Sequence, residues 1–240
     1  MAFMATLQCI DLGHCAFAPA LDLQRLLVRR VQADGWQAYL VLVEHDPPVI
    51  TLGVSADNRN ILASPEELEA AGIAVHHTRR GGDVTYHGPG QLVGYPIFRL
   101  TLRRQSLRRY LRDIEQALIA AVGRLGVEAK RRRGLPGVWV GRRKLAAIGV
   151  AVSRWVTYHG FALNVSPDLA HFDLIVPCGL TGSGVTSLAE LLGAPPEMGR
   201  VRMLVAQALA EVFSFAEIRW TPPEQARGAC HRLDRLSPGR

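Results

Sequence analysis

The segment 79–96, RRGGDVTYHGPGQLVGYP, constrains the fold more than any other part of the chain. Glycine and proline recur in it too often for a regular helix, and glycine also lets a ligand approach the backbone closely. Between the glycines stand polar and aromatic side chains: Thr85, Tyr86, His87 and Gln91. This combination predicts a substrate-binding loop, with a surface turn cluster as the alternative.

The chain has 240 residues, of which 48% are hydrophobic and 20% charged, as expected of one globular domain. No run of about 18 apolar residues indicates a transmembrane helix, and the N-terminal sequence lacks the pattern of a secretory signal. The four cysteines form no CxxC pair, so reduced thiols in the cytoplasm are expected. We expect one domain over residues 1–220 and a loosely ordered tail over 221–240.

The net charge of +7 is concentrated in residues 99–133, which hold eleven Lys or Arg and three Asp or Glu. A basic region of this kind attracts an anionic partner. Charge alone leaves open whether that partner is nucleic acid, an acidic protein or anionic lipid, and a solvated helix face is the simpler alternative.

The order of elements predicts a mixed α/β fold. Apolar residues at helical spacing predict helices over 21–31, 106–126, 187–192 and 198–212. A further short helix is marked by a capping box at Ser64 and Glu67, with Pro65 at its first position and Gly72 after its end. Apolar β-rich runs predict strands over 39–43, 49–53, 73–78, 92–100, 138–140, 145–152 and 157–165.

Two residues are candidates for catalytic chemistry. Cys178 lies between a proline and a glycine after an apolar run, a more accessible setting than that of a core cysteine. Lys144 lies at the return of a predicted hairpin and leads into the apolar run LAAIGV, where its amine would be partly buried and suited to proton exchange. A packed cysteine and an exposed turn lysine are the alternatives.

The sequence alone does not decide the roles of the histidines. His87 and His159 each precede a glycine and are candidates for a proton shuttle or for packed core positions. His76 and His77 lie on a predicted strand and point to opposite faces, which makes them poor joint metal ligands. The sequence has no zinc-ligand spacing, no GxxxxGK[ST] and no strand-positioned GxGxxG. We therefore expect no metal and no nucleotide site of these types.

Five segments taken together resemble the LipB family of lipoyl(octanoyl) transferases. They occur in order between about residues 40 and 192: RRGGDVTYHGPGQLVGYP, GRRKLAAIGV, HGFALNV, FDLIVPCG and GVTSL. The resemblance implies an α/β (α+β) fold, in which a single domain of the biotin and lipoate protein ligase type has a mixed sheet and surrounding helices. Asp83 departs from the family pattern, which often has Gln there.

The resemblance also implies an activity and a site. Members transfer an octanoyl group from acyl carrier protein to a lysine of a lipoyl domain, through a thioester on the enzyme. Cys178 matches the nucleophile, and Lys144 matches the lysine that lowers the pKa of the thiol and acts as acid and base; His159 is a possible auxiliary residue. The residues that match the substrate-binding segments are Arg80, Gly81, Gly82, Asp83, Val84, Thr85, Tyr86, His87, Ala147, Ile148, Gly149, Gly160, Phe161 and Ala162.

The same resemblance implies the partners: octanoyl-acyl carrier protein as donor, and the lipoyl domains of 2-oxoacid dehydrogenase complexes and the glycine cleavage H protein as acceptors. No ATP or metal cofactor, nucleic acid or membrane is expected. Backbone N–H groups near Cys178 and Lys144 are candidates for holding the oxyanion, and the arginines over 103–112 for binding an acidic carrier protein. An ATP-dependent lipoate or biotin ligase is the closest alternative, and a nucleic-acid-binding module is an alternative of another class.

Overall fold

The fold is built on an eight-stranded mixed sheet, seen in a computed structural model that describes residues 6–100, 106–176, 184–222 and 224–226. The strand order is β11-β1-β2-β6-β10-β9-β8-β7, in which β1 pairs in parallel with β2 and β11 and the other neighbours are antiparallel. The strands are β1 (Thr6–Cys15), β2 (Ala38–His45), β6 (Gln91–Ile97), β7 (Lys130–Arg132), β8 (Leu135–Val140), β9 (Arg143–Ser153), β10 (Val156–Asn164) and β11 (Glu217–Trp220).

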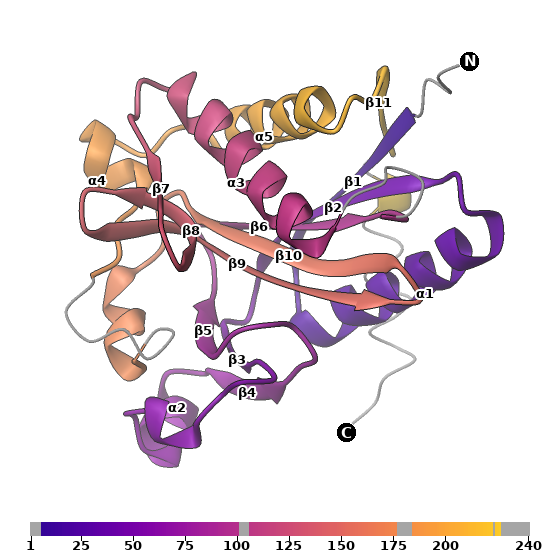
Figure 1. Ribbon diagram of the computed structural model, residues 1–240. Coiled ribbons are helices and arrows are strands. Elements are labelled where there is room, and N and C mark those ends of the chain that lie inside the picture. The colour runs from indigo at the N-terminus through magenta and orange to yellow at the C-terminus, as the bar shows by residue number, and fades with distance from the viewer. Residues whose placement is uncertain (1–5, 101–105, 177–183, 223, 227–240) are drawn as a thin grey trace.

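A second, three-stranded sheet has the order β4-β3-β5 and lies apart from the large one. Its strands are β3 (Val49–Leu52), β4 (Ala74–His77) and β5 (Val84–His87). The helices are α1 (Phe17–Asp34), α2 (Pro65–Ala70), α3 (Leu107–Gly123), α4 (Leu188–Leu192) and α5 (Met198–Val212), with 3₁₀ turns η1 (Asn58–Asn60) and η3 (Leu169–Leu174). Figure 1 shows α3 and α5 on one side of the large sheet and the small sheet on the other.

Both faces of the large sheet are buried, and successive side chains of a strand point to opposite faces. On β2, Leu40 and Leu42 pack in the core beneath α3 and α5, whereas Tyr39, Val41 and Val43 pack against α1. Side chains two residues apart share a face of a strand, so this one apolar run supplies both cores. A third apolar cluster fills the small sheet and its contact with η3.

Most of the predicted elements are confirmed, with boundaries that differ by a few residues. The capping box of α2 forms as predicted: Ser64 Oγ accepts from Glu67 N, and Glu67 Oε2 accepts from Ser64 N at 2.7 Å. The hairpin that carries Lys144 is the β8–β9 pair. The strands β1, β7 and β11 were not predicted, and residues 84–87 form a fully buried strand where a loop was expected.

The basic region is partly neutralised within the chain. Arg109 pairs with Asp113 at 2.9 Å on α3, Arg131 pairs with buried Glu115, and Arg124 reaches Glu211 on α5 at 2.6 Å. Arg108 and Arg112 are exposed, and positions 103 and 104 lie outside the described residues. Since α3 packs on α5, its exposed arginines lie on the side of the large sheet that is away from the small sheet (Figure 1).

Cys9 and Cys15, the cysteines among the described residues, differ in their bonding state. Cys9 is a free, fully buried thiol on β1, and burial raises its pKa to about 12. Cys15 is disulfide-bonded, so the expectation of reduced thiols is wrong at this residue. Within the described ranges, no helix is long and apolar enough to cross a membrane. Most of the predicted tail over 221–240 falls outside the described residues, and that boundary stays a prediction.

Candidate active site

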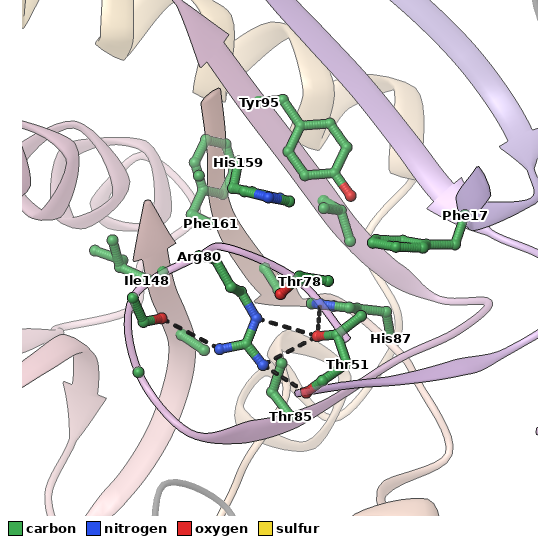
Figure 2. A pocket seen from close by; sticks show the side chains of 17 residues that line it. Phe17, Thr51, Thr78, Arg80, Thr85, His87, Tyr95, Ile148, His159 and Phe161 are labelled. Carbon is green, nitrogen blue, oxygen red and sulfur yellow. Dashed lines mark hydrogen bonds between the residues drawn. The ribbon is translucent and has the colours of Figure 1, made fainter. Parts of the chain in front are cut away.

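A pocket lies between the small sheet and the face of the large sheet that also carries α1, and Figure 2 shows the side chains that line it. Its empty volume is about 510 Å³, part of which is open to solvent. It is lined by Phe17, Thr51, Thr78, Arg80, Gly81, Gly82, Thr85, His87, Val93, Tyr95, Ala147, Ile148, Gly149, His159, Gly160, Phe161 and Ala162. The three segments singled out in the sequence, which come from β5 and its loop, β9 and β10, thus meet around one cavity.

The alternation of β5 decides which of its residues reach the pocket. Thr85 and His87 line it, whereas Val84 and Tyr86 point into the cluster beneath the small sheet, where the Tyr86 hydroxyl lies 2.8 Å from His171 Nδ1. Val84 and Tyr86 therefore do not come to the pocket, contrary to the sequence-based expectation, because neighbouring side chains of a strand face opposite ways.

Asp83 is also turned away from the pocket. Its Oδ1 accepts from Asp57 N at 3.2 Å and its Oδ2 accepts from Asn60 Nδ2 at 2.5 Å. Asn60 O in turn accepts from Val176 N at 2.8 Å. Asp83 thus braces the turn η1, and through it the last described residue before the segment that holds Cys178.

Backbone forms much of the pocket wall. A Cβ on Gly160 would lie 2.1 Å from Gly94 O, and one on Gly149 would lie 2.8 Å from Gly81 O. Real Cβ atoms do not approach oxygen this closely, so both sites require glycine for close packing of the chain on itself.

Arg80 holds the glycine loop in place. The side chain is buried, with Nε and Nη2 donating to Thr51 Oγ1 at 3.1 and 3.0 Å and Nη2 also donating to Thr51 O at 2.6 Å (Figure 2). Nη1 donates to Gly81 O at 3.2 Å. The guanidinium thereby ties the loop to β3 and supplies a fixed positive charge at the floor of the pocket.

The imidazoles around the pocket are neutral. Burial lowers the pKa of His45 to about 4, and burial lowers the pKa of His87 and that of His159 to about 3. His45 Nε2 lies 2.6 Å from the hydroxyl of Tyr95, whose pKa burial raises. The pocket is consequently lined by uncharged polar and apolar groups around a single buried guanidinium, a lining suited to an alkyl chain.

We expect the folded state to lose stability as the pH falls below about 6.5. The unfolded chain binds protons at its histidines from about pH 6.5 downward, whereas buried His45, His87 and His159 stay neutral in the folded state until about pH 3 to 4. Each can cost up to about 1.4 kcal/mol per pH unit. Urea unfolding followed from about pH 7.5 to 5 measures the slope, and His159→Gln should make it shallower. An equal slope in that variant would contradict the assignment.

Lys144 lies in a smaller pocket that adjoins the first. It is lined by Thr85, Gln91, Lys144, Ala147, Ala162, Asn164, Phe172 and Val185, and it shares Thr85, Ala147 and Ala162 with the first pocket. Lys144 is 8% exposed, so the predicted burial of this residue is confirmed, and its Nζ lies 4.9 Å from the centroid of the Trp139 ring. The first pocket therefore ends beside the buried side chain of Lys144.

The backbone of Lys144 is fully engaged. Its N–H donates to Gly184 O at 2.9 Å and its carbonyl accepts from Thr186 N at 3.0 Å. Because this N–H already has an acceptor, it is not available to an oxyanion, and the other N–H groups near Lys144 and Cys178 stay the predicted donors. Cys178 lies outside the described residues. Gly184, the first described residue after it, is bonded directly to Lys144.

His159 lies at the other end of the first pocket. It pairs with Val150, six positions along β9 from Lys144, a separation of about 20 Å. Its φ is +54°, a region that residues other than glycine seldom occupy, and its N–H donates to Gln24 Oε1 of α1 at 2.9 Å. The structure therefore does not bring His159 to Lys144. His87 is hydrogen-bonded to Gln91, which lines the smaller pocket together with Lys144.

Several lining residues were not predicted. Thr51 and Thr78 lie in predicted strands that carry no functional motif, Phe17 lies outside the predicted elements, and only the fold brings the three to the cavity. Val93 and Tyr95 lie within the glycine-rich segment, where the alternation of β6 was the available signal. Among the described residues, no group of three or more His, Cys, Asp or Glu side chains is placed to hold a metal ion.

Comparison with known proteins identifies the family. A model of the lipoyl protein ligase A/B catalytic domain matches residues 17–210. The chain belongs to this family. Among curated members, the octanoyltransferase of Solibacter usitatus (strain Ellin6076) is 50% identical over 205 residues, covering 85% of this chain and 92% of the relative. That of Syntrophotalea carbinolica is 49% identical over 217 residues, covering 90% and 96%. The resemblance to the LipB octanoyltransferases, an acyltransferase class, is confirmed.

The fold of the family recurs in solved structures of low sequence identity. Protein Ta0514 from T. acidophilum with bound lipoic acid has a TM-score of 0.71 at 15% identity, with 95% of each chain covered. Lipoate-protein ligase A bound with ATP has a TM-score of 0.66 at 14% identity, with 96% of this chain and 94% of the ligase covered. The predicted mixed α/β fold of the biotin and lipoate ligase type is thus confirmed.

Proposed function

We propose that this chain transfers an octanoyl group from acyl carrier protein to the lysine of a lipoyl domain, through a thioester on Cys178. The observation that carries the proposal is the placement of Lys144, a buried amine at the end of a pocket whose lining is uncharged apart from Arg80. Curated relatives about half identical to the chain bear the name octanoyltransferase, which supports the same assignment.

The alkyl chain occupies the larger pocket in this proposal. Arg80, Gly81, Gly82, Thr85 and His87 form one side, and the segments 147–149 and 160–162 form the other. The acyl carbonyl then lies toward Thr85, Ala147 and Ala162, the residues that both pockets share. Asp83, Val84 and Tyr86 support these walls without touching the acyl group.

Two acyl transfers account for the chemistry. The Cys178 thiolate attacks the thioester carbonyl of the donor, the new C–S bond forms, and the carrier thiol leaves with a proton from Lys144. The acceptor amine then attacks the acyl-enzyme, the amide forms, and the thiolate of Cys178 is released while Lys144 takes the proton from nitrogen. The ammonium form of Lys144 also favours the neighbouring thiolate.

No nucleotide enters this scheme. A thioester donor and a thioester intermediate are similar in energy, so the transfer proceeds without ATP or a metal ion. The acceptors would be the lipoyl domains of 2-oxoacid dehydrogenase complexes and the glycine cleavage H protein, and the cytoplasmic location stays a prediction. The exposed arginines of α3 lie on the far side of the large sheet from the pocket, which disfavours them as the docking site of the carrier protein.

Mixing the protein with octanoyl-acyl carrier protein in the absence of ATP should give one octanoyl adduct by intact-protein mass, removed by hydroxylamine. Cys178→Ser should give no such thioester. Cys9→Ser is the matched control and should be acylated like the wild type, because the buried Cys9 thiol stays protonated.

A different pattern would redirect the proposal. If no variant is acylated by the carrier, and a lipoyl domain is modified only when free octanoate and ATP are supplied, the chain is a ligase. An adduct that persists in Cys178→Ser and disappears in Cys9→Ser would identify Cys9 instead of Cys178 as the nucleophile.

A further inference from the structure

A chain of buried hydrogen bonds runs from the glycine loop to the strand pairing around Lys144. It passes from Arg80 to Thr51, then to His87, Gln91 and Asn164, and it ends on the carbonyl of Thr186. All six residues are buried, from 0% exposed at Thr186 to 8% at Arg80. The acyl pocket and the Lys144 pocket are therefore joined by polar contacts as well as by shared walls.

The groups at the two ends of this hydrogen-bond path fix the direction in which its members donate. The Arg80 guanidinium only donates, so Thr51 Oγ1 accepts from it, and the hydroxyl hydrogen of Thr51 is left for His87 Nε2 at 3.4 Å. At the other end, Thr186 O only accepts, so Asn164 donates to it through Nδ2 at 3.0 Å. That orientation turns Asn164 Oδ1 back toward Gln91.

Gln91 and His87 complete the same order. Gln91 Nε2 donates to Asn164 Oδ1 at 2.9 Å and to Tyr86 O at 3.2 Å, which leaves Gln91 Oε1 to accept from His87 Nδ1 at 2.7 Å. A neutral imidazole carries one N–H, and here it must be at Nδ1, so Nε2 accepts from Thr51. Every group in the path thus donates toward Lys144.

The last acceptor belongs to the segment that pairs with Lys144. Thr186 N donates to Lys144 O, Lys144 N donates to Gly184 O, and Val185 forms a parallel bridge with Lys144. Asn164 therefore holds from the side the segment 184–186 that brackets the lysine. In the smaller pocket, Asn164 and Gln91 also line the cavity together with Lys144.

We propose that Gln91 and Asn164 are positioning residues for Lys144, which hold the segment 184–186 and hence the amine in place through this one-way chain of donors. The inference rests on the proposed function for its kinetic readout. It assigns these two amides a role in the rate of acyl transfer rather than in the binding of the acyl chain.

Asn164→Asp tests the last link. The ionised carboxylate has no hydrogen to donate to Thr186 O, whereas the protonated acid can donate again, and burial raises the pKa of a carboxyl at such a site. At pH 8, kcat should fall about tenfold relative to the wild type, with the KM for the acyl donor changed less than about twofold. The ratio of variant to wild-type kcat should rise at least about threefold between pH 8 and pH 6.

Gln207→Glu is the matched control, since it makes the same chemical change at an exposed position of α5 and should leave the ratio flat. A second readout does not depend on activity. Trp139 is buried beneath the Lys144 amine, whereas Trp36, Trp155 and Trp220 are exposed. In a background with these three changed to Phe, Asn164→Asp should shift the emission of Trp139 at pH 8 and reverse the shift at pH 6.

The two readouts test the positioning role and the proposed function separately. A pH-independent ratio together with unchanged Trp139 emission would show that Asn164 does not position Lys144. A pH-dependent emission shift with no octanoyl transfer by the wild type would keep the positioning role and reject the proposed function. If Asn164→Asp does not fold, Gln91→Glu offers the same test one hydrogen bond earlier. If neither variant folds at any pH, the hydrogen-bond path stabilises the core and has no separate positioning role.

Discussion

Replacing Lys144 with methionine is expected to reduce octanoyl transfer by about a thousandfold while the protein stays folded. The methionine keeps most of the apolar contact with Trp139 but removes the group that, in the proposed mechanism, exchanges protons with the carrier thiol and the acceptor amine. Rates of lipoyl-domain acylation and the yield of acyl-enzyme, both measured with octanoyl-acyl carrier protein, give the size of the effect. Formation of the acyl-enzyme and its consumption should both slow, because the proposed mechanism uses the amine in both steps.

Lys130→Met is the matched control. Lys130 is exposed on β7 and pairs with Glu128 at 2.8 Å, so its loss should leave the transfer rate within about twofold of the wild type. Thermal unfolding of both variants separates a catalytic defect from a folding defect. A Lys144→Met protein that is folded and transfers octanoyl at the wild-type rate would remove Lys144 from the mechanism.

Gly160→Ala is expected to destabilise the protein by at least about 3 kcal/mol. The added Cβ would lie 2.1 Å from Gly94 O and 2.7 Å from the Pro96 ring, and neither the backbone oxygen nor the ring can turn aside. Relief requires β10 and β6 to separate where they pair at the pocket wall. Urea unfolding measures the loss, and octanoyl transfer should fall with it because the same strands line the cavity.

Gly123→Ala makes the same chemical change without the clash. Gly123 is the last residue of α3 and does not have a positive φ, and a Cβ added to it would meet no atom within 4 Å. Alanine there should be neutral or stabilise the fold by up to about 1 kcal/mol. Equal stability of the Gly160→Ala and Gly123→Ala proteins would mean that the contact between β10 and β6 is looser than described.

The sequence was sufficient where local signals and the fold agree. The capping box of α2, the long amphipathic helix α3 and the β8–β9 hairpin each follow from residues close together in the chain. The ordered motifs also located the walls of the pocket, because the segments 80–87, 147–149 and 160–162 come from strands that border the cavity. Whether those residues bind the acyl chain stays a prediction.

The sequence was insufficient where pairing is distant. The edge strands β7 and β11 are short and charged, and only their partners β8 and β1 make them strands. The left-handed backbone at His159 is held by Gln24, which lies 135 residues earlier in the chain. Within VTYH, apolar Val84 and Tyr86 alternate with polar Thr85 and His87, but this signal applies only to a strand, and the glycines around it had predicted a loop.

If the pocket binds the acyl chain as proposed, its main-chain walls limit how its substrate range can be redesigned. At Gly149 and Gly160 every possible replacement adds atoms, so point mutations there can only narrow the slot. Room for a branched or bulkier acyl group has to come from side chains that can be made smaller, of which Phe17, Val93 and Tyr95 are the candidates. A wider cross-section is therefore accessible only through these side chains and not through the two glycines.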